Sequence, residues 1–199
     1  MLIKGNPAQF SNKSILHPLL RKDINEVLIL DYRLRCRLND KSVPIKFLDK
    51  IFVVSKNSFI QNNKNISRKI RKYVSELLSE FSGSILGLGG ETYMYLSILE
   101  NNSKKNFITN NESIYNDSIF NNLSRNYETD LVNYEKVEIL KTFEIAVVNL
   151  SNLNSFLMKQ LNYCVRGHII IISCNHNDFW KKTKLLTKFK LKSRKRIID

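Results

Sequence analysis

The sequence has few of the residues that build metal sites and disulfide frameworks. Its three cysteines, Cys36, Cys164 and Cys174, form no Cys-x-x-Cys pair and lie at no recognisable spacing from the three histidines. We therefore expect neither a zinc site nor a disulfide framework. Reduced thiols suit a reducing compartment better.

Long apolar runs and an apolar leader are also missing. No stretch of about 18 apolar residues occurs, and the first ten residues, MLIKGNPAQF, lack the apolar core of a signal peptide. We expect an intracellular protein without a membrane partner, located in a cytoplasm, a virus-infected cytoplasm or a mitochondrion. A length of 199 residues with 43% hydrophobic residues is typical of one globular domain.

Acidic residues are scarce, 18 against 32 basic ones, which gives a net charge of +14. The basic excess is greatest after residue 180, where we predict that a C-terminal helix over 177–189 binds RNA through Lys181, Lys182, Lys184 and Lys188. Such a surface attracts a polyanion, and each neutralised phosphate releases counterions. A base-composition bias toward Lys and Asn codons is the alternative explanation.

The N-terminal quarter predicts an arm followed by a small antiparallel β element, together covering residues 1–55. Within 27–38, Arg33, Arg35 and Arg37 alternate with apolar residues, which places the three arginines on one face of a strand. Two further strands are expected, one before Lys50 and one at 51–55. The arginine row is a second candidate RNA surface, although an ordinary solvated sheet face has the same pattern.

From residue 56 to 199 the pattern alternates between helix and strand. Helical periodicity covers 65–81. Strands are expected at 84–88, 106–109, 137–140, 143–150 and 168–174, with helices at 91–100, 112–126, 155–165 and 177–189. This alternation predicts an α/β domain with a doubly wound, mostly parallel sheet.

A glycine-rich turn, Gly87, Gly89 and Gly90, separates the first of these strands from its helix. Such a turn allows a ligand to approach the backbone at a helix N-terminus. It is neither a P-loop nor a complete Gly-x-Gly-x-x-Gly fingerprint. Asn110 stands where a ribose-binding acid is expected, with Glu112 two residues later. A purely structural turn that holds no ligand is the alternative.

The order of these motifs over about residues 51–199 resembles the RNA uracil-5-methyltransferases. The matching segments are SFIQNNKNI (58–66), SILGLGGETYMYL (84–96), FEIAVVNL (143–150) and IIIISCNHNDF (169–179). The resemblance implies a Rossmann-like methyltransferase domain over 56–199, S-adenosylmethionine as cofactor and RNA as partner. Cys174 matches the catalytic nucleophile, and Gln61, Gly87, Gly89, Gly90, Asn110 and Asn149 match cofactor-contacting positions.

The sequence departs from the family pattern at its carboxylates. Asn110 and Asn149 replace two acids, His176 replaces the proline after Ser-Cys-Asn, and the general-base glutamate would lie beyond Asp199. Loss of these groups removes proton acceptors that the reaction needs. We therefore expect a pseudoenzyme, in which Cys174 is simply a small buried residue.

Three functions remain open at this point. The favoured one is an RNA-binding protein built on a degenerate methyltransferase domain, for example a subunit of a larger ribonucleoprotein such as an organellar ribosome. The second is an active, divergent RNA methyltransferase that uses Cys174. The third is a viral or organellar assembly protein whose basic surface contacts acidic protein.

Overall fold

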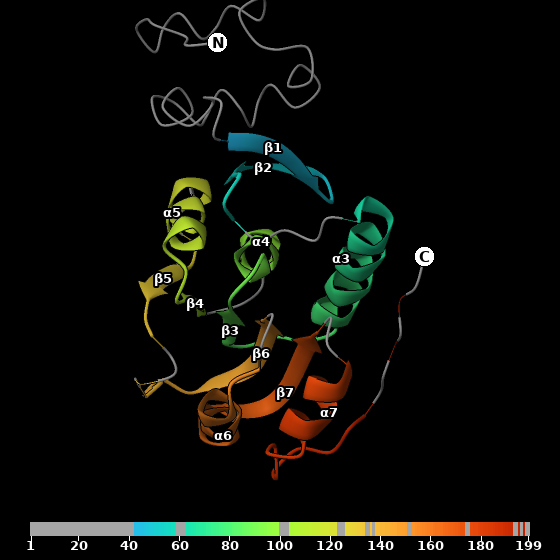
Figure 1. The fold of residues 1–199 in the computed structure, drawn as a ribbon, viewed down its shortest axis with the longest axis vertical. Helices are drawn as coiled ribbons and strands as arrows, with labels where there is room; N and C mark the ends of the chain where they lie inside the picture. Colours follow the sequence, from blue (N-terminus) through green and yellow to red (C-terminus); the bar gives the residue numbers. More distant parts are fainter. Residues whose placement is uncertain are drawn as a thin grey trace, which may run out of the picture.

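The computed structural model shows a parallel sheet with helices on both faces and a small hairpin beside it (Figure 1). The residues that it describes are 42–58, 63–99, 104–122, 126–133, 136, 138–150, 153–173, 176–192, 195 and 197. The elements are β1 Ser42–Phe47, β2 Lys50–Ser55, α3 Lys64–Ser79, β3 Ile85–Leu88, α4 Thr92–Ile98, β4 Lys105–Thr109, α5 Glu112–Asn121, β5 Glu128–Leu131, β6 Phe143–Asn149, α6 Ser155–Cys164, β7 Val165–Ile172 and α7 His176–Thr183.

The larger sheet has the strand order β5-β4-β3-β6-β7, and every neighbouring pair is parallel. The strand order reverses between β3 and β6. After β3 the chain adds β4 and β5 on one side, and it then crosses back to add β6 and β7 on the other side of β3. In open α/β sheets, ligands bind outside the carboxyl ends of the strands at such a switch point. The Rossmann-like fold class expected from the sequence is confirmed.

Each face of the sheet carries its own core, because neighbouring strand residues point to opposite faces. Ile145 and Val147 of β6 pack with residues of α3, α4 and α5, whereas Ala146 and Val148 pack with residues of α6. Strand β3 is buried along its whole length. Strands that are covered on both faces are near-continuous apolar runs, as β3 and residues 145–148 of β6 are.

The hairpin β1–β2 is antiparallel and packs onto the first of these cores through Phe47, Phe52 and Val54. The N-terminal small antiparallel element is confirmed for this hairpin. The strand expected over 27–38, which contains Arg33, Arg35 and Arg37, lies outside the described residues.

Two polar side chains of α5 hold the end of this hairpin. Asp117 is fully buried and accepts hydrogen bonds from the Ser55 N–H, the Ser55 hydroxyl and the Ser58 hydroxyl. Asn121 accepts from the Val53 N–H at 2.9 Å and donates to the Val53 carbonyl at 2.8 Å. The hairpin is thus fixed to the domain by packing and by hydrogen bonds.

The fifth strand of the sheet lies at a different place from the one expected. The strand predicted at 137–140 is wrong for its described part, since residues 138–140 are not in a strand, and β5 is formed by Glu128–Leu131 instead. β5 is an edge strand with mostly exposed side chains, so it lacks the apolar pattern that marks a buried strand. Within the described part of the chain, no helix has the length and apolar character needed to cross a membrane.

Candidate functional site

The glycine turn lies at the carboxyl end of β3, at the switch point of the sheet. Gly89 and Gly90 both have positive φ, 66° and 48°, a conformation that glycine adopts at low cost. The Gly89 N–H donates to the carbonyl of Ile108 on β4, and the Gly89 carbonyl accepts from the N–H and hydroxyl of Thr92. The turn is therefore held between β4 and the start of α4.

The end of β6 packs directly onto this turn. A Cβ atom at Gly89 would overlap the Leu150 side chain, and one at Gly90 would lie 2.8 Å from Asn149 Nδ2 and 2.9 Å from the Asn149 carbonyl oxygen. The structure thus brings together three of the predicted cofactor-contacting residues, Gly89, Gly90 and Asn149. Close packing inside the protein accounts for the glycines at 89 and 90. Gly87, within β3, lies against Thr92.

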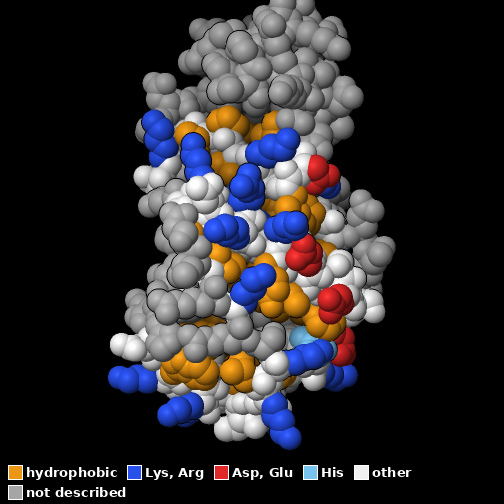
Figure 2. All heavy atoms as spheres, turned by 90° about the vertical axis from the view of Figure 1, so that its right-hand side faces the viewer, with side chains coloured by type: hydrophobic (Ala, Val, Ile, Leu, Met, Phe, Trp, Pro, Cys, Tyr) orange, Lys and Arg blue, Asp and Glu red, His pale blue; other side chains and the backbone are white. Residues whose placement is uncertain are grey.

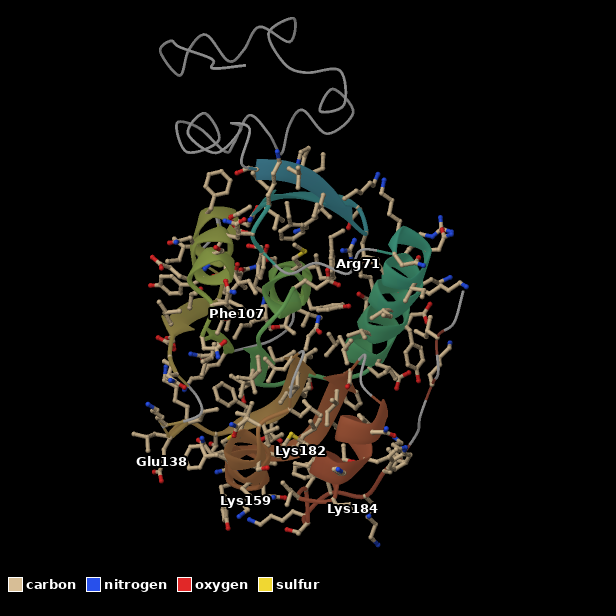
Figure 3. The ribbon with its side chains drawn as sticks, in the orientation of Figure 1. Arg71, Phe107, Glu138, Lys159, Lys182 and Lys184 are labelled. Atoms are coloured by element: carbon tan, nitrogen blue, oxygen red, sulfur yellow. The ribbon has the colours of Figure 1, made fainter. Side chains whose placement is uncertain are left out.

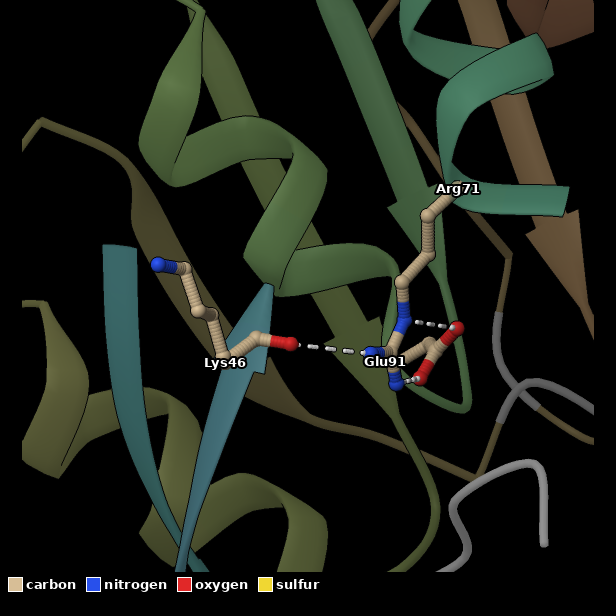
Figure 4. Close-up of polar contacts among 3 residues, drawn as sticks. All are labelled: Lys46, Arg71 and Glu91. Carbon is tan, nitrogen blue, oxygen red and sulfur yellow. Dashed lines mark hydrogen bonds and ion pairs between the residues drawn. The ribbon is translucent and has the colours of Figure 1, made fainter. Parts of the chain in front are cut away.

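The residue after the turn, Glu91, forms a buried ion pair with Arg71 of α3 (Figure 4). Arg71 donates from Nη2 to Oε2 at 2.7 Å and from Nε to Oε1 at 3.3 Å. Its third bond, from Nη1, goes to the carbonyl of Lys46 on β1 at 3.2 Å. One guanidinium therefore links α3, the hairpin and the glycine turn.

This ion pair is not among the site residues expected from the sequence, although the position of Arg71 carries a signal. Arg71 occupies the apolar stripe of α3, whose buried positions are Ser67, Arg71, Val74 and Leu78. A charged residue in such a stripe needs a buried partner. The guanidinium carbon also lies 5.0 Å from the centroid of the Phe47 ring.

Tyr95 of α4 lies in the same electrostatic environment. Burial raises the pKa of its hydroxyl far above the ordinary tyrosine range, the Glu91 carboxylate raises it further, and Arg71 lowers it. The hydroxyl has no hydrogen-bond partner among the described residues. Its ring packs edge-on against Phe47 at 4.8 Å between centroids. Tyr95 is therefore a neutral core residue.

Beyond the glycine turn, the strand ends of this site present amides where acids are expected. Asn110 is exposed after β4, and the next residue, Asn111, caps α5 by accepting from the Ile114 N–H at 3.0 Å. Glu112 is exposed in the first turn of α5. The nearby Glu91 carboxylate is occupied by Arg71. Gln61 and Cys174 lie outside the described residues.

The C-terminal basic segment only partly follows the expected helix. α7 ends at Thr183, so Lys184 and Lys188 lie in the turns that follow and not in a helix over 177–189. The reason is Asn162 of α6, whose amide donates to the Leu185 carbonyl and accepts from the Lys188 N–H. These bonds satisfy backbone groups that a longer helix would have paired.

Three of the four lysines predicted to bind RNA in this segment are exposed, and Lys182 is half-buried. Lys181, Lys184 and Lys188 are exposed, and Lys182 donates to the Ser155 hydroxyl of α6 at 2.7 Å. Figure 3 shows Lys182 and Lys184 beside α6 and α7, with Lys159 of α6 nearby.

A second basic surface covers α3. Figure 2 shows basic side chains spread over this face of the molecule, with the acidic ones gathered toward one margin. The exposed basic residues of α3 are Lys64, Arg68, Lys69 and Lys72. Lys195 extends this surface, since its Nζ lies 4.3 Å from the ring centroid of Tyr73.

The fold of this chain is similar to that of solved methyltransferase structures. No family model and no curated protein matches the chain. A similar solved structure is the Pyrococcus abyssi tRNA (uracil-54, C5)-methyltransferase in complex with S-adenosyl-L-homocysteine, with 23% identity over 74% of this chain and a TM-score of 0.58. This chain spans only 38% of the length of that protein.

A second similar structure is the N-methyltransferase NodS from Bradyrhizobium japonicum. It has 12% identity, a TM-score of 0.52, and coverage of 64% of this chain and 84% of NodS. NodS has also been solved in complex with S-adenosyl-L-homocysteine. At 23% and 12% identity, these similarities show the fold alone. The chain has the Rossmann-like fold of S-adenosylmethionine-dependent methyltransferases.

Proposed function

We propose that this chain is an RNA-binding protein built on a methyltransferase fold whose cofactor site has degenerated, and that it acts as a subunit of a larger ribonucleoprotein. The observation that carries the proposal is the charge of the C-terminal region. From residue 145 to the end the sequence contains 11 basic and two acidic residues. Lys181, Lys184 and Lys188 of this region are exposed. Such a surface favours a polyanionic partner.

RNA is favoured over DNA because of the fold comparison. The Pyrococcus abyssi protein, whose structure covers most of this chain, is by name a methyltransferase of tRNA. The basic region also includes α7, which belongs to the Rossmann-like fold.

Degeneration of the cofactor site is supported by the residues at the strand ends. S-adenosylmethionine carries a ribose whose hydroxyls a carboxylate binds best, since hydrogen bonds to charged acceptors are the stronger ones. This chain offers the amides Asn110 and Asn149, while Glu91 is engaged by Arg71. Asn149 and Leu150 already pack against the glycine turn. The residues present therefore fit the cofactor poorly, and we assign no reaction step to it.

The proposal is tested by the salt dependence of RNA binding. We expect the parent chain to bind RNA with an affinity that falls steeply with salt. Replacing Lys181, Lys182, Lys184 and Lys188 by Gln should reduce the slope of log affinity against log salt by roughly 3, because each phosphate that is no longer neutralised lowers the slope by about 0.7–0.9.

The matched control is a variant that removes the same charge from α3, with Lys64, Arg68, Lys69 and Lys72 replaced by Gln. Its slope should change much less than that of the C-terminal variant. Absence of RNA binding at low salt would refute the proposal. An equal change in both variants would show that net charge alone attracts RNA and that the C-terminal surface has no special part.

A further inference from the structure

The exposed face of α6 carries two aromatic residues and a lysine in one line. Phe156, Lys159 and Tyr163 follow the i, i+3, i+7 spacing that aligns side chains along a helix. Phe156 is 38% and Tyr163 75% exposed. The opposite face of α6 buries Leu157, Met158, Leu161 and Cys164 against the sheet. The aromatic line is therefore surplus to the packing of the helix.

Lysines from the following segment border this line. Lys188 Nζ lies over one face of the Tyr163 ring, 4.6 Å from its centroid, at the C-terminal end of α6, so a base would stack on the opposite face of this ring. Lys182 donates to Ser155 at the N-terminal end of the same helix. Figure 3 shows Lys159 and Lys182 at α6, with Glu138 on its other side. Glu138 belongs to the loop whose Ile139 N–H donates to Gln160 of α6, so an anionic strand would run along the lysine side.

We propose that this α6 stripe, Phe156, Lys159 and Tyr163 with Lys182 and Lys188 beside it, binds unpaired RNA by stacking bases on its aromatic rings. The inference rests on the RNA-binding function proposed above and names its substrate class. Exposed aromatic rings interleaved with cations form a platform for single-stranded nucleic acid, because every base has a face that can stack.

The geometry favours single strands over duplexes. Seven residues separate Phe156 from Tyr163, which corresponds to about 10 Å along the helix axis. In an RNA duplex the base faces are stacked on one another, and proteins contact its phosphates and 2′-hydroxyls instead. Only unpaired nucleotides can present base faces to both rings. The stripe therefore suits a loop, bulge or single-stranded end.

The test compares a fluorescein-labelled single-stranded RNA with its blunt-ended duplex, by anisotropy at fixed salt, using the full chain. We expect Phe156→Leu and Tyr163→Leu each to weaken single-strand binding at least about fivefold, with the duplex affinity and the salt slope unchanged. Tyr163→Phe keeps the ring and should retain parental affinity. It also separates loss of stacking from loss of the hydroxyl.

The matched control is Tyr73→Leu, which removes another tyrosine that lies beneath a lysine, Lys195, but on α3. It should leave both affinities unchanged. If the parent binds RNA and the α6 variants match the parent on single strands, the stripe is not a stacking platform, while the RNA-binding function stands. If the parent binds neither RNA form but does bind poly-glutamate, both proposals fail and an acidic protein is the partner.

Discussion

Arg71 and Glu91, 20 residues apart in the sequence, are joined by two hydrogen bonds in the interior, with side chains only 10% and 4% exposed. The pair fixes the residue that directly follows the glycine turn. Removing either side chain would leave the other as an unpaired charge buried away from water. The free-energy cost of that buried charge is larger than the net stabilisation that the intact ion pair provides.

The first prediction concerns this ion pair. Glu91→Gln should lower the free energy of unfolding by about 3–5 kcal/mol, because it leaves the Arg71 guanidinium uncompensated. The double variant Arg71→Met, Glu91→Leu should recover most of that loss. Urea denaturation measures both. The control is Lys72→Gln in the exposed pair with Glu76, whose atoms are 3.9 Å apart and whose loss should cost less than about 1 kcal/mol. Equal effects at the two pairs would contradict the prediction.

The second prediction concerns the glycine turn. Gly90→Ala should destabilise the fold by at least about 1–2 kcal/mol, because an alanine at φ 48° is strained and its Cβ would meet Asn149. Asn149→Ala should recover the part that arises from the side-chain overlap. A double-mutant cycle in thermal or urea unfolding measures this coupling. Strict additivity would show that Asn149 does not press on the turn.

The third prediction concerns the alkaline limb of the stability curve. Burial raises the pKa of the Cys164 thiol to about 11 from a usual value of 9.0. Between these two pH values the unfolded chain binds fewer protons than the folded one, so the free energy of unfolding falls as pH rises. Below pH 9.0 both states hold the proton, and the contribution is constant.

Comparing the parent with Cys164→Ala checks this effect. The free energy of unfolding should fall more steeply in the parent than in Cys164→Ala as pH rises from 8 to 11, by at most about 3 kcal/mol over this interval. Only the difference in slope counts, since the substitution also changes packing at neutral pH. Parallel curves would mean that the thiol ionises in the folded protein as readily as in the unfolded chain.

The fourth prediction concerns the cofactor. Calorimetry of the parent chain with S-adenosylmethionine should show no binding in the low micromolar range or tighter, since amides stand at 110 and 149. Asn110→Asp should strengthen whatever binding is present by about tenfold, because it supplies a charged acceptor. Asn111→Asp, one residue later at the cap of α5, is the matched control. Tight binding by the parent would overturn the proposed degeneration.

The parts of the fold that follow simple periodicity could be predicted from the sequence. β3 is an apolar run that leads into the glycine turn, β6 and β7 contain the apolar runs 145–148 and 169–172, and α3 has a clear apolar stripe. β5 could not be found in this way, because its residues gain their strand conformation from pairing with β4. The end of α7 was also missed, since Asn162 on a different helix determines it.

In the candidate site too, features set by local sequence could be predicted, and features set by contacts between distant elements could not. The position of the glycine turn and of Asn110 followed from local sequence, because strand ends and turns are local features. The pairing of Arg71 with Glu91, and the packing of Leu150 on Gly89, depend on elements that are distant in the chain. No spacing rule connects such residues, so only the folded structure could reveal them.

The hydrogen bonds between Asn121 and Val53 protect one edge of the hairpin from pairing with a strand of another molecule. A strand edge with unpaired N–H and carbonyl groups is a template for pairing with another chain, which leads to aggregation. At Val53 the Asn121 amide takes both bonds that an incoming strand would need. The side chain of one helix thereby blocks strand addition at this point of the hairpin.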